Sequence, residues 1–249
     1  MGNESQGCRR QAPYDVHVSP KVPSAVGNRD ATNVVHERVR RLILDGELEP
    51  GSEISQLELA RRLETSRTPL REALRMLERE GLVVNCGPHK LMRVSSLSMQ
   101  DLDDLYSLRV MGEGLAIWLT VPALRDEDFE DLERFLEIAS VQSHRDFHRR
   151  LRIGAGERLR EHLDLLFEHA ERYQRAYRHR TSGDPLKLDE HRAIVDACRA
   201  HDRELARELM VDHTAGTAIG LMTAERHAPF TLPTAITMAK AGRTLTGAH

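Results

Sequence analysis

A stripe of arginines in the first third of the chain has the spacing of a helix surface that could bind phosphate. Arginines recur every fourth residue between Ser66 and Gly81, at Arg67, Arg71, Arg75 and Arg79. Side chains four residues apart lie one above another on an α-helix, so these guanidinium groups would form a row of bidentate donors. The opposite side of the same helix is apolar, with Leu70, Ala73, Leu74 and Leu77. The sequence therefore predicts a helix that packs on one face and fits a DNA groove with the other.

Three histidines in the second half of the chain could bind a divalent metal ion. His148, His191 and His213 lie beside apolar residues in three different segments with helical periodicity. Neutral imidazole is the commonest protein ligand for zinc, nickel and similar ions, and a three-histidine set leaves coordination positions for water or a carboxylate. Because the chain has 13 histidines, spacing alone leaves open whether these three converge.

The charges are unevenly distributed along the 249 residues. The formal net charge is −3, but the segment from Arg61 to Arg93 carries eight Lys and Arg against four Glu and is locally +4, while the remainder is −7. A basic segment on an acidic protein indicates a DNA-facing module attached to another domain. No apolar run approaches the roughly 18 residues of a membrane span, and the N-terminus lacks the apolar core of a signal peptide. We therefore expect a soluble, cytoplasmic protein with no membrane partner.

Periodicity and capping signals place the arginine helix inside a small N-terminal domain. Residues 1–30 have no sustained period and are expected to be a disordered tail, whereas residues 31–96 carry the signals of a helix-turn-helix with a wing. The expected elements are a helix from Thr32, a second helix from Ser55 to Leu63, the arginine helix after Ser66, and a β-hairpin from Leu82 to Val94.

Residues 97–227 show an almost uninterrupted helical pattern and form the expected second domain. Ser98 and Asp101 open a long amphipathic helix. Further helices are expected over residues 126–141, 143–153, 158–177, 185–200 and 203–224. These segments form a bundle of about six helices, and residues 228–249 are left as a C-terminal tail. The expected fold class is mainly α: an N-terminal winged helix-turn-helix of three helices plus a β-hairpin, followed by an all-α helical bundle.

The first domain resembles a known family of bacterial regulators. The stretch from Val35 to Val94 is similar to the winged helix-turn-helix of GntR-type transcription regulators. The resemblance rests on Leu48, Pro50, Gly51, Leu59, Ala60, Leu63, Ser66, Arg67, Thr68, Pro69, Arg71, Glu72, Ala73, Leu74, Leu77, Glu80, Gly81 and Leu82. It implies that Arg67 and Arg71 contact the operator and that the wing reaches the minor groove. The DNA-binding residues expected are Arg67, Thr68, Arg71, Arg75, Gly87, His89 and Lys90.

The second domain resembles the FCD effector-binding domain of the FadR branch of that family. The resemblance rests on Asp146, Phe147, His148, Leu151, Glu190, His191, Arg192, Ala193, Ile194, Asp202 and His213, with the earlier pair Arg109 and Glu113. It implies a divalent metal ion bound by His148, His191 and His213. The family's aspartate ligand, four residues before the first histidine, is replaced here by His144. His144 either completes an all-imidazole site, which favours zinc or nickel over magnesium or calcium, or faces solvent.

Arg109 is expected on the first helix of the second domain, at a family position that faces the effector cavity. Its guanidinium either holds an effector carboxylate or pairs with Glu113, four residues on. The resemblances imply a ligand-responsive bacterial transcription regulator that binds an inverted-repeat operator in double-stranded DNA as a homodimer, controlled by a small organic acid. The alternatives are a metal-dependent helical enzyme, for which no general base is evident, and a helical DNA-binding protein without an effector.

Overall fold

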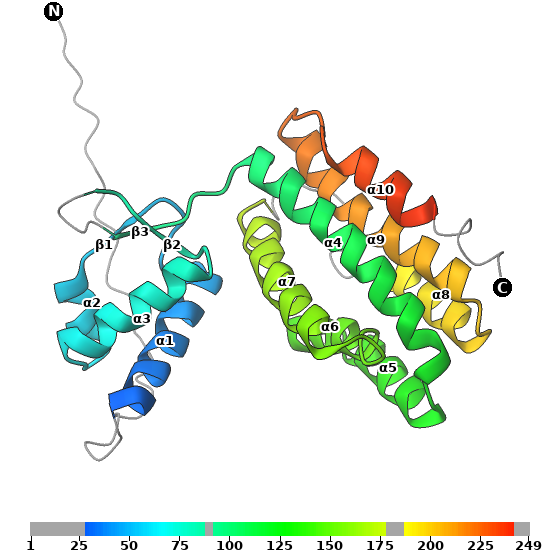
Figure 1. Ribbon diagram of the computed structural model, residues 1–249, viewed down its shortest axis with the longest axis horizontal. Helices are drawn as coiled ribbons and strands as arrows, with labels where there is room; N and C mark the ends of the chain where they lie inside the picture. The colour runs from blue at the N-terminus through cyan, green and yellow to red at the C-terminus, as the bar shows by residue number, and fades with distance from the viewer. Residues whose placement is uncertain (1–27, 88–91, 178–186, 242–249) are drawn as a thin grey trace, which may run out of the picture.

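The computed structural model describes residues 28–87, 92–177 and 187–241, which form two units joined by a short extended segment (Figure 1). The elements of the first unit are α1 (Asn28–Leu44), β1 (Glu53–Ile54), α2 (Gln56–Arg62), α3 (Arg67–Arg79), β2 (Val83–Asn85) and β3 (Met92–Val94). The strands lie in the order β1-β3-β2, and both pairings are antiparallel. This arrangement is the expected helix-turn-helix followed by a β-hairpin wing.

The sheet contains one strand that the sequence did not predict. Glu53 and Ile54 of β1 pair with Arg93 and Met92 of β3, and the Arg93 guanidinium donates to the Glu53 carboxylate at 3.0 Å. Two residues cannot show a period-two alternation. The strand is defined only by its pairing with a segment 40 residues later, so it lacks a local signal.

Capping of the helices follows the sequence in part. The hydroxyls of Ser55 and Ser98 each accept a hydrogen bond from the backbone amide three residues later, at 3.4 and 3.1 Å, as expected for N-caps. Ser66 occupies the N-cap of α3, but its side chain accepts no capping hydrogen bond. Pro69 is buried in the first turn of α3, where its missing amide hydrogen costs little.

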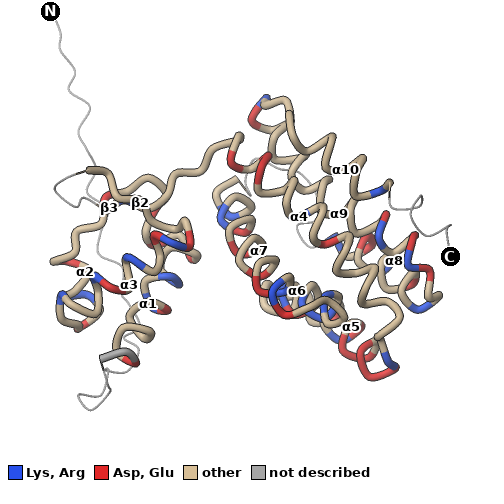
Figure 2. Tube along the Cα trace, viewed as in Figure 1, with Lys and Arg blue, Asp and Glu red and all other residues tan. Residues whose placement is uncertain are grey.

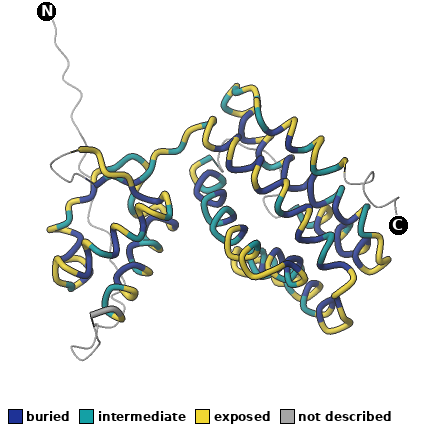
Figure 3. The backbone as a smooth tube through the Cα atoms, in the orientation of Figure 1, coloured by how far each residue is buried: buried dark blue, intermediate teal, exposed yellow. Residues whose placement is uncertain are grey.

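The second unit is a bundle in which α4 lies between α7 on one side and α9 and α10 on the other (Figure 1). Its elements are α4 (Met99–Thr120), the 3-10 turn η1 (Val121–Ala123), α5 (Asp126–Ile138), α6 (Val141–Arg150), α7 (Glu157–Tyr177), α8 (Leu188–Arg199), α9 (Arg203–Ala224) and α10 (Leu232–Lys240). Buried residues line the facing sides of these helices (Figure 3). Within the described ranges, no helix is long and apolar enough to cross a membrane.

The C-terminal segment corrects one expectation. Residues 228–249 were expected to be a tail, but they contain α10, which packs against α4 and α9. The carboxylate of Asp103, buried on α4, accepts the backbone amides of Phe230, Thr231 and Leu232 at 3.2, 2.7 and 3.1 Å. This carboxylate satisfies the amides that begin a helix. Because the capping group lies 127 residues or more away in sequence, this cap has no local sequence signal.

Helix α7 joins the bundle to the first unit. Arg172 on α7 donates to the backbone carbonyl of Ser95, in the segment between β3 and α4, at 2.7 Å. Arg40 on α1 donates to the carboxylate of Glu168 on α7 at 3.2 Å. α7 therefore holds both the connecting segment and a helix of the first unit.

Candidate functional site

The outward face of α3 carries the arginine stripe. Arg67, Thr68, Arg71 and Arg75 are exposed, while the apolar side of the helix is buried, and Figure 2 shows the basic positions along α3. Arg71 and Arg75 share the carboxylate of Glu72, at 3.7 and 2.9 Å; Arg67 forms no ion pair with any residue that the structure describes. Exposed pairs of this kind contribute about 0–1 kcal/mol, so the arginines can exchange Glu72 for a phosphate at little cost.

An exposed glycine follows the first strand of the wing. Gly87 has a φ of 138°, which side chains with a Cβ rarely adopt, and its amide donates to the Asn85 side chain at 3.3 Å. An added Cβ at Gly87 would meet no described atom within 4 Å. His89 and Lys90, the other two expected wing contacts, lie outside the described residues.

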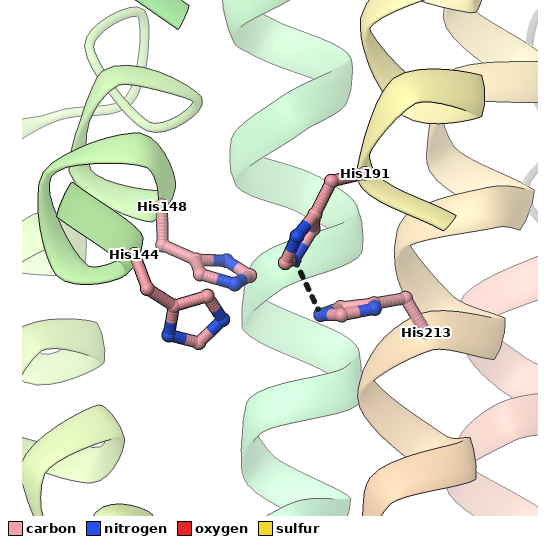
Figure 4. A group of neighbouring side chains, drawn as sticks. All are labelled: His144, His148, His191 and His213. Carbon is pink, nitrogen blue, oxygen red and sulfur yellow. Dashed lines mark hydrogen bonds between the residues drawn. The ribbon is translucent and has the colours of Figure 1, made fainter. Parts of the chain in front are cut away.

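Four histidines meet inside the second unit. His144 and His148 come from α6, His191 from α8 and His213 from α9 (Figure 4). One ligand nitrogen from each ring lies within 4.8 Å of the others, and the ring centroids of His144 and His191 are 5.2 Å apart. The structure thus brings the three expected ligands together. His144 faces the other three rings, which is the orientation that an all-imidazole site requires.

This donor set fits a divalent ion. Four nitrogens bound tetrahedrally to one ion at about 2.0–2.1 Å are about 3.3 Å apart. Nitrogens that lie up to 4.8 Å apart therefore need to approach one another by about 1.5 Å. The Nδ1 atom of His148 is buried and has no hydrogen-bond partner among the described residues. A buried unpaired nitrogen costs about 1–3 kcal/mol. Such a cost is expected at a site that binds a further group, here a metal ion.

Burial favours the neutral form of three of the four imidazoles, those of His144, His148 and His213. It lowers the pKa of His144 to about 4 and lowers the pKa of His148 well below its usual value. Burial also lowers the pKa of His213, although Glu190 accepts a hydrogen bond from this ring. That hydrogen bond in turn lowers the pKa of Glu190 to about 2. Metals bind the neutral form of imidazole, so these three histidines are in their ligand form at neutral pH.

A buried charge network lies beside the cluster. Arg109 donates to Glu113 at 3.3 Å, so the pair that was one of the two alternatives for Arg109 is present. Arg152 donates to both oxygens of the same carboxylate, at 2.8 and 2.5 Å, and these three residues are at most 3% exposed. Burial alone would raise the pKa of Glu113, but Arg152 and Arg109 hold it below its usual value. The other end of Arg152 donates to the half-exposed Asp164 at 2.8 Å.

Arg152 and Phe167 belong to this site, and the sequence reasoning missed both. Arg152 follows His144 and His148 at successive steps of four residues, so the spacing held a usable signal. The Phe167 ring centroid lies 5.1 Å from the ring centroid of His148, and 4.9 and 5.4 Å from the guanidinium carbons of Arg109 and Arg152. Phe167 therefore forms an aromatic wall shared by the histidines and the arginines. Nothing in the pattern of α7 separates it from an ordinary core residue.

Two family models match the chain. Residues 31–85 match the model described as bacterial regulatory proteins, gntR family, and residues 104–216 match the FCD domain. The HTH-type transcriptional repressor GlaR of Escherichia coli (strain K12) is 30% identical over 192 residues, which cover 69% of this chain and 86% of that protein. This chain belongs to the GntR family. It is a transcription regulator with an FCD domain, and not an enzyme, so the family expectation is confirmed.

Further comparisons of this GntR regulator agree in sequence and in fold. The probable D-xylose utilization operon transcriptional repressor of Paenarthrobacter nicotinovorans is 31% identical over 210 residues, covering 77% of this chain and 90% of that protein. The solved structure of E. coli McbR/YncC superposes with a TM-score of 0.66 at 20% identity, covering 78% of this chain and 98% of the other. At this identity, the structural likeness supports the predicted fold class alone.

Proposed function

We propose that this GntR-family regulator binds an inverted-repeat operator as a homodimer, and that a small organic acid bound beside a divalent metal ion controls its affinity for DNA. The observation that carries the proposal is the convergence of four imidazoles and two buried arginines in the unit that α7 joins to the winged helix. The names of the two relatives favour repression as the sign of regulation.

Operator contacts are assigned to α3 and the wing. They would come from Arg67, Thr68, Arg71 and Arg75 on α3, and from Gly87, His89 and Lys90 in the wing. The start of a recognition helix reaches base edges in the major groove, while phosphate contacts supply much of the affinity. The exposed arginines and the local charge of +4 support this assignment.

The metal ion is assigned to His144, His148, His191 and His213. An all-nitrogen set favours zinc or nickel, because magnesium and calcium prefer oxygen ligands. When bound, the ion would supply a Lewis-acidic coordination position for a carboxylate oxygen.

Arg109 is assigned to the effector. Its Nη2 is engaged by Glu113, but its Nε is buried and has no hydrogen-bond partner among the described residues. A guanidinium has five N–H donors, so Arg109 can bind a further carboxylate through a charge-assisted hydrogen bond while it is paired with Glu113. The two alternatives for Arg109 are therefore compatible, because one nitrogen serves each partner.

The homodimer is assigned to an apolar stripe on α4. Leu108, Met111 and Leu115 are spaced three and four residues apart, so they lie on one face of α4. Their exposed fractions are 62%, 40% and 50%. A helix that is apolar on most of its circumference is normally buried on all sides. A second copy of the chain covering this stripe would bury it, and would pair two winged helices for the two halves of an inverted repeat.

The test uses the full chain and promoter fragments from its own genome. Fluorescence anisotropy should show binding at low ionic strength, with the logarithm of the affinity falling by about 0.9 per log unit of salt for each phosphate neutralised. Candidate carboxylates should alter that affinity when zinc or nickel is present and lose most of their effect after chelation. Failure to retain any promoter fragment would contradict the proposal, and retention unaffected by metal and acids would favour a regulator without an effector.

A further inference from the structure

A carboxylate at the start of α8 contacts His213, the histidine that α9 contributes to the cluster. The Glu190 Oε2 atom lies 2.8 Å from the Nδ1 atom of His213. The Lys187 ammonium donates to the same Glu190 oxygen at 3.0 Å and to the backbone carbonyl of His213 at 3.5 Å. Glu190 is therefore held in place by a lysine on one side and an imidazole on the other.

This contact selects one tautomer of His213. An ionised carboxylate only accepts hydrogen bonds, so Nδ1 of His213 must carry the proton that it donates to Glu190. In the neutral ring the lone pair then resides on Nε2. That atom lies in the cluster, 3.2 Å from Nε2 of His191 (Figure 4). The lone pair of His213 is thus directed toward the other imidazoles.

We propose that Glu190 is a positioning residue that fixes His213 in the tautomer able to bind a metal ion through Nε2. The inference rests on the proposed metal site. It goes beyond that site, because it assigns a role to a residue that binds no metal itself. Helix α8 then contributes twice: His191 enters the cluster, and the residue before it orients the ligand on α9. A carboxylate on the far nitrogen of a ligand histidine fixes its ring and raises its basicity.

The expected effect is modest because the carboxylate is partly in water. Loss of an outer-shell partner of this kind weakens metal binding by about 10–100-fold. The Glu190 side chain is 48% exposed, so solvent screens its charge, and most of its effect must come from the tautomer. We therefore expect the lower end of that range, a loss of about tenfold.

The experiment compares three variants of the full chain. Glu190→Ala removes the acceptor, and Glu190→Gln keeps the shape but can either accept from Nδ1 or donate to it, which allows both tautomers. Asp189→Ala is the matched control, because Asp189 is also an acid in the first turn of α8. Its side chain is 98% exposed and pairs with Arg192 at 3.0 Å. Thermal melts of the metal-free proteins verify that each variant is folded.

Two readouts decide the inference. Zinc affinity, measured by competition with a chromophoric chelator, should fall about tenfold in Glu190→Ala, fall less in Glu190→Gln, and stay unchanged in Asp189→Ala. Nitrogen-15 NMR of the metal-free protein should find the proton of His213 on Nδ1 in the natural sequence and partly on Nε2 in Glu190→Ala.

The outcomes separate this inference from the proposed function. If zinc binds the natural protein and Glu190→Ala equally tightly, or if the tautomer of His213 does not change, the role of Glu190 is overturned while the metal site stands. If the natural protein takes up neither zinc nor nickel, the metal site fails and the inference fails with it.

Discussion

Replacing Glu168 with glutamine is expected to weaken communication between the ligand site and the DNA-binding domain. Arg40 on α1 donates to Glu80 at 3.3 Å and to Glu168 at 3.2 Å. Glu80 is the C-cap of α3, and Phe167, the neighbour of Glu168, lies 5.1 Å from the ring of His148. One turn of α7 therefore touches the histidine cluster and, through a single arginine, the end of the helix that carries the arginine stripe.

The magnitude follows from the burial of this bridge. A hydrogen bond to a charged group contributes about 1.5–3 kcal/mol, whereas an exposed ion pair contributes about 0–1 kcal/mol. The side chains of Arg40 and Glu168 are 18% and 13% exposed, so their interaction lies between the buried and the exposed case. Glutamine also retains one oxygen that can accept a hydrogen bond. We take about 1 kcal/mol for the lost interaction. Since 1.4 kcal/mol corresponds to a factor of ten, the ratio of operator affinities with and without ligand should change about fivefold.

The assay is anisotropy of a labelled operator, titrated with the natural protein and with Glu168→Gln, each with and without metal and acid. Glu161→Gln is the control, because Glu161 is exposed on the same helix and has no ion pair within the described ranges. The reasoning is refuted if Glu168→Gln gives the same affinity ratio as the natural protein. It is equally refuted if both affinities change by one common factor, because the bridge would then stabilise the fold without transmitting the ligand signal.

Four other substitutions probe the DNA surface, the dimer stripe, the core and the pH dependence. Arg67→Ala should lower operator affinity by about 1–3 kcal/mol and relax base preference; unchanged gel-shift titrations would contradict its role. Leu115→Glu should produce monomers in sedimentation velocity, because it places a charge in the proposed interface; a persisting dimer would move the interface elsewhere. Gly154→Ala should lower the free energy of unfolding, measured by urea denaturation, by about 1–3 kcal/mol, because its Cβ would lie 2.6 Å from the Leu119 carbonyl oxygen. Unchanged stability would show that the backbone shifts to accommodate the methyl group. The hydrogen bond to Glu80 raises the pKa of His36 above 6.5, so its stabilisation is complete below that pH and is lost as the pH rises through the folded-state pKa. The melting-temperature difference between the natural protein and His36→Gln should therefore shrink from about pH 5.5 to pH 9, and a constant difference would contradict the assignment.

Local signals were sufficient for most of the elements. Gly46 and Gly81 follow the first helix and the arginine helix, and they have φ values of 77° and 74°, which close helices in the left-handed region. The periodicity of the arginine helix likewise separated its buried leucines from its exposed arginines. These features depend on residues within one or two turns of each other, so the sequence displays them directly.

The site was harder to predict because it depends on which helices are neighbours. Periodicity places His148, His191 and His213 on the inner faces of three helices, but it does not pair those faces. The family resemblance supplied the pairing. For His144, spacing left two directions open, and packing decides between them: its ring lies 4.7 Å from His148 and 5.6 Å from Phe167. Contacts of this kind exist only after the bundle has formed.

The buried charges explain why the effector is expected to be an acid. Beside the histidine cluster, Arg109 and Arg152 face the buried carboxylate of Glu113. The further partner of Arg152 is Asp164, whose side chain is 37% exposed and screened by water. The interior therefore retains positive charge, which is costly to bury without a partner. An uncharged ligand could offer hydrogen bonds to the Nε of Arg109 but would leave that charge uncompensated. A carboxylate would supply both the acceptor and the opposite charge, so the binding of an acid would offset the cost of burying this positive charge.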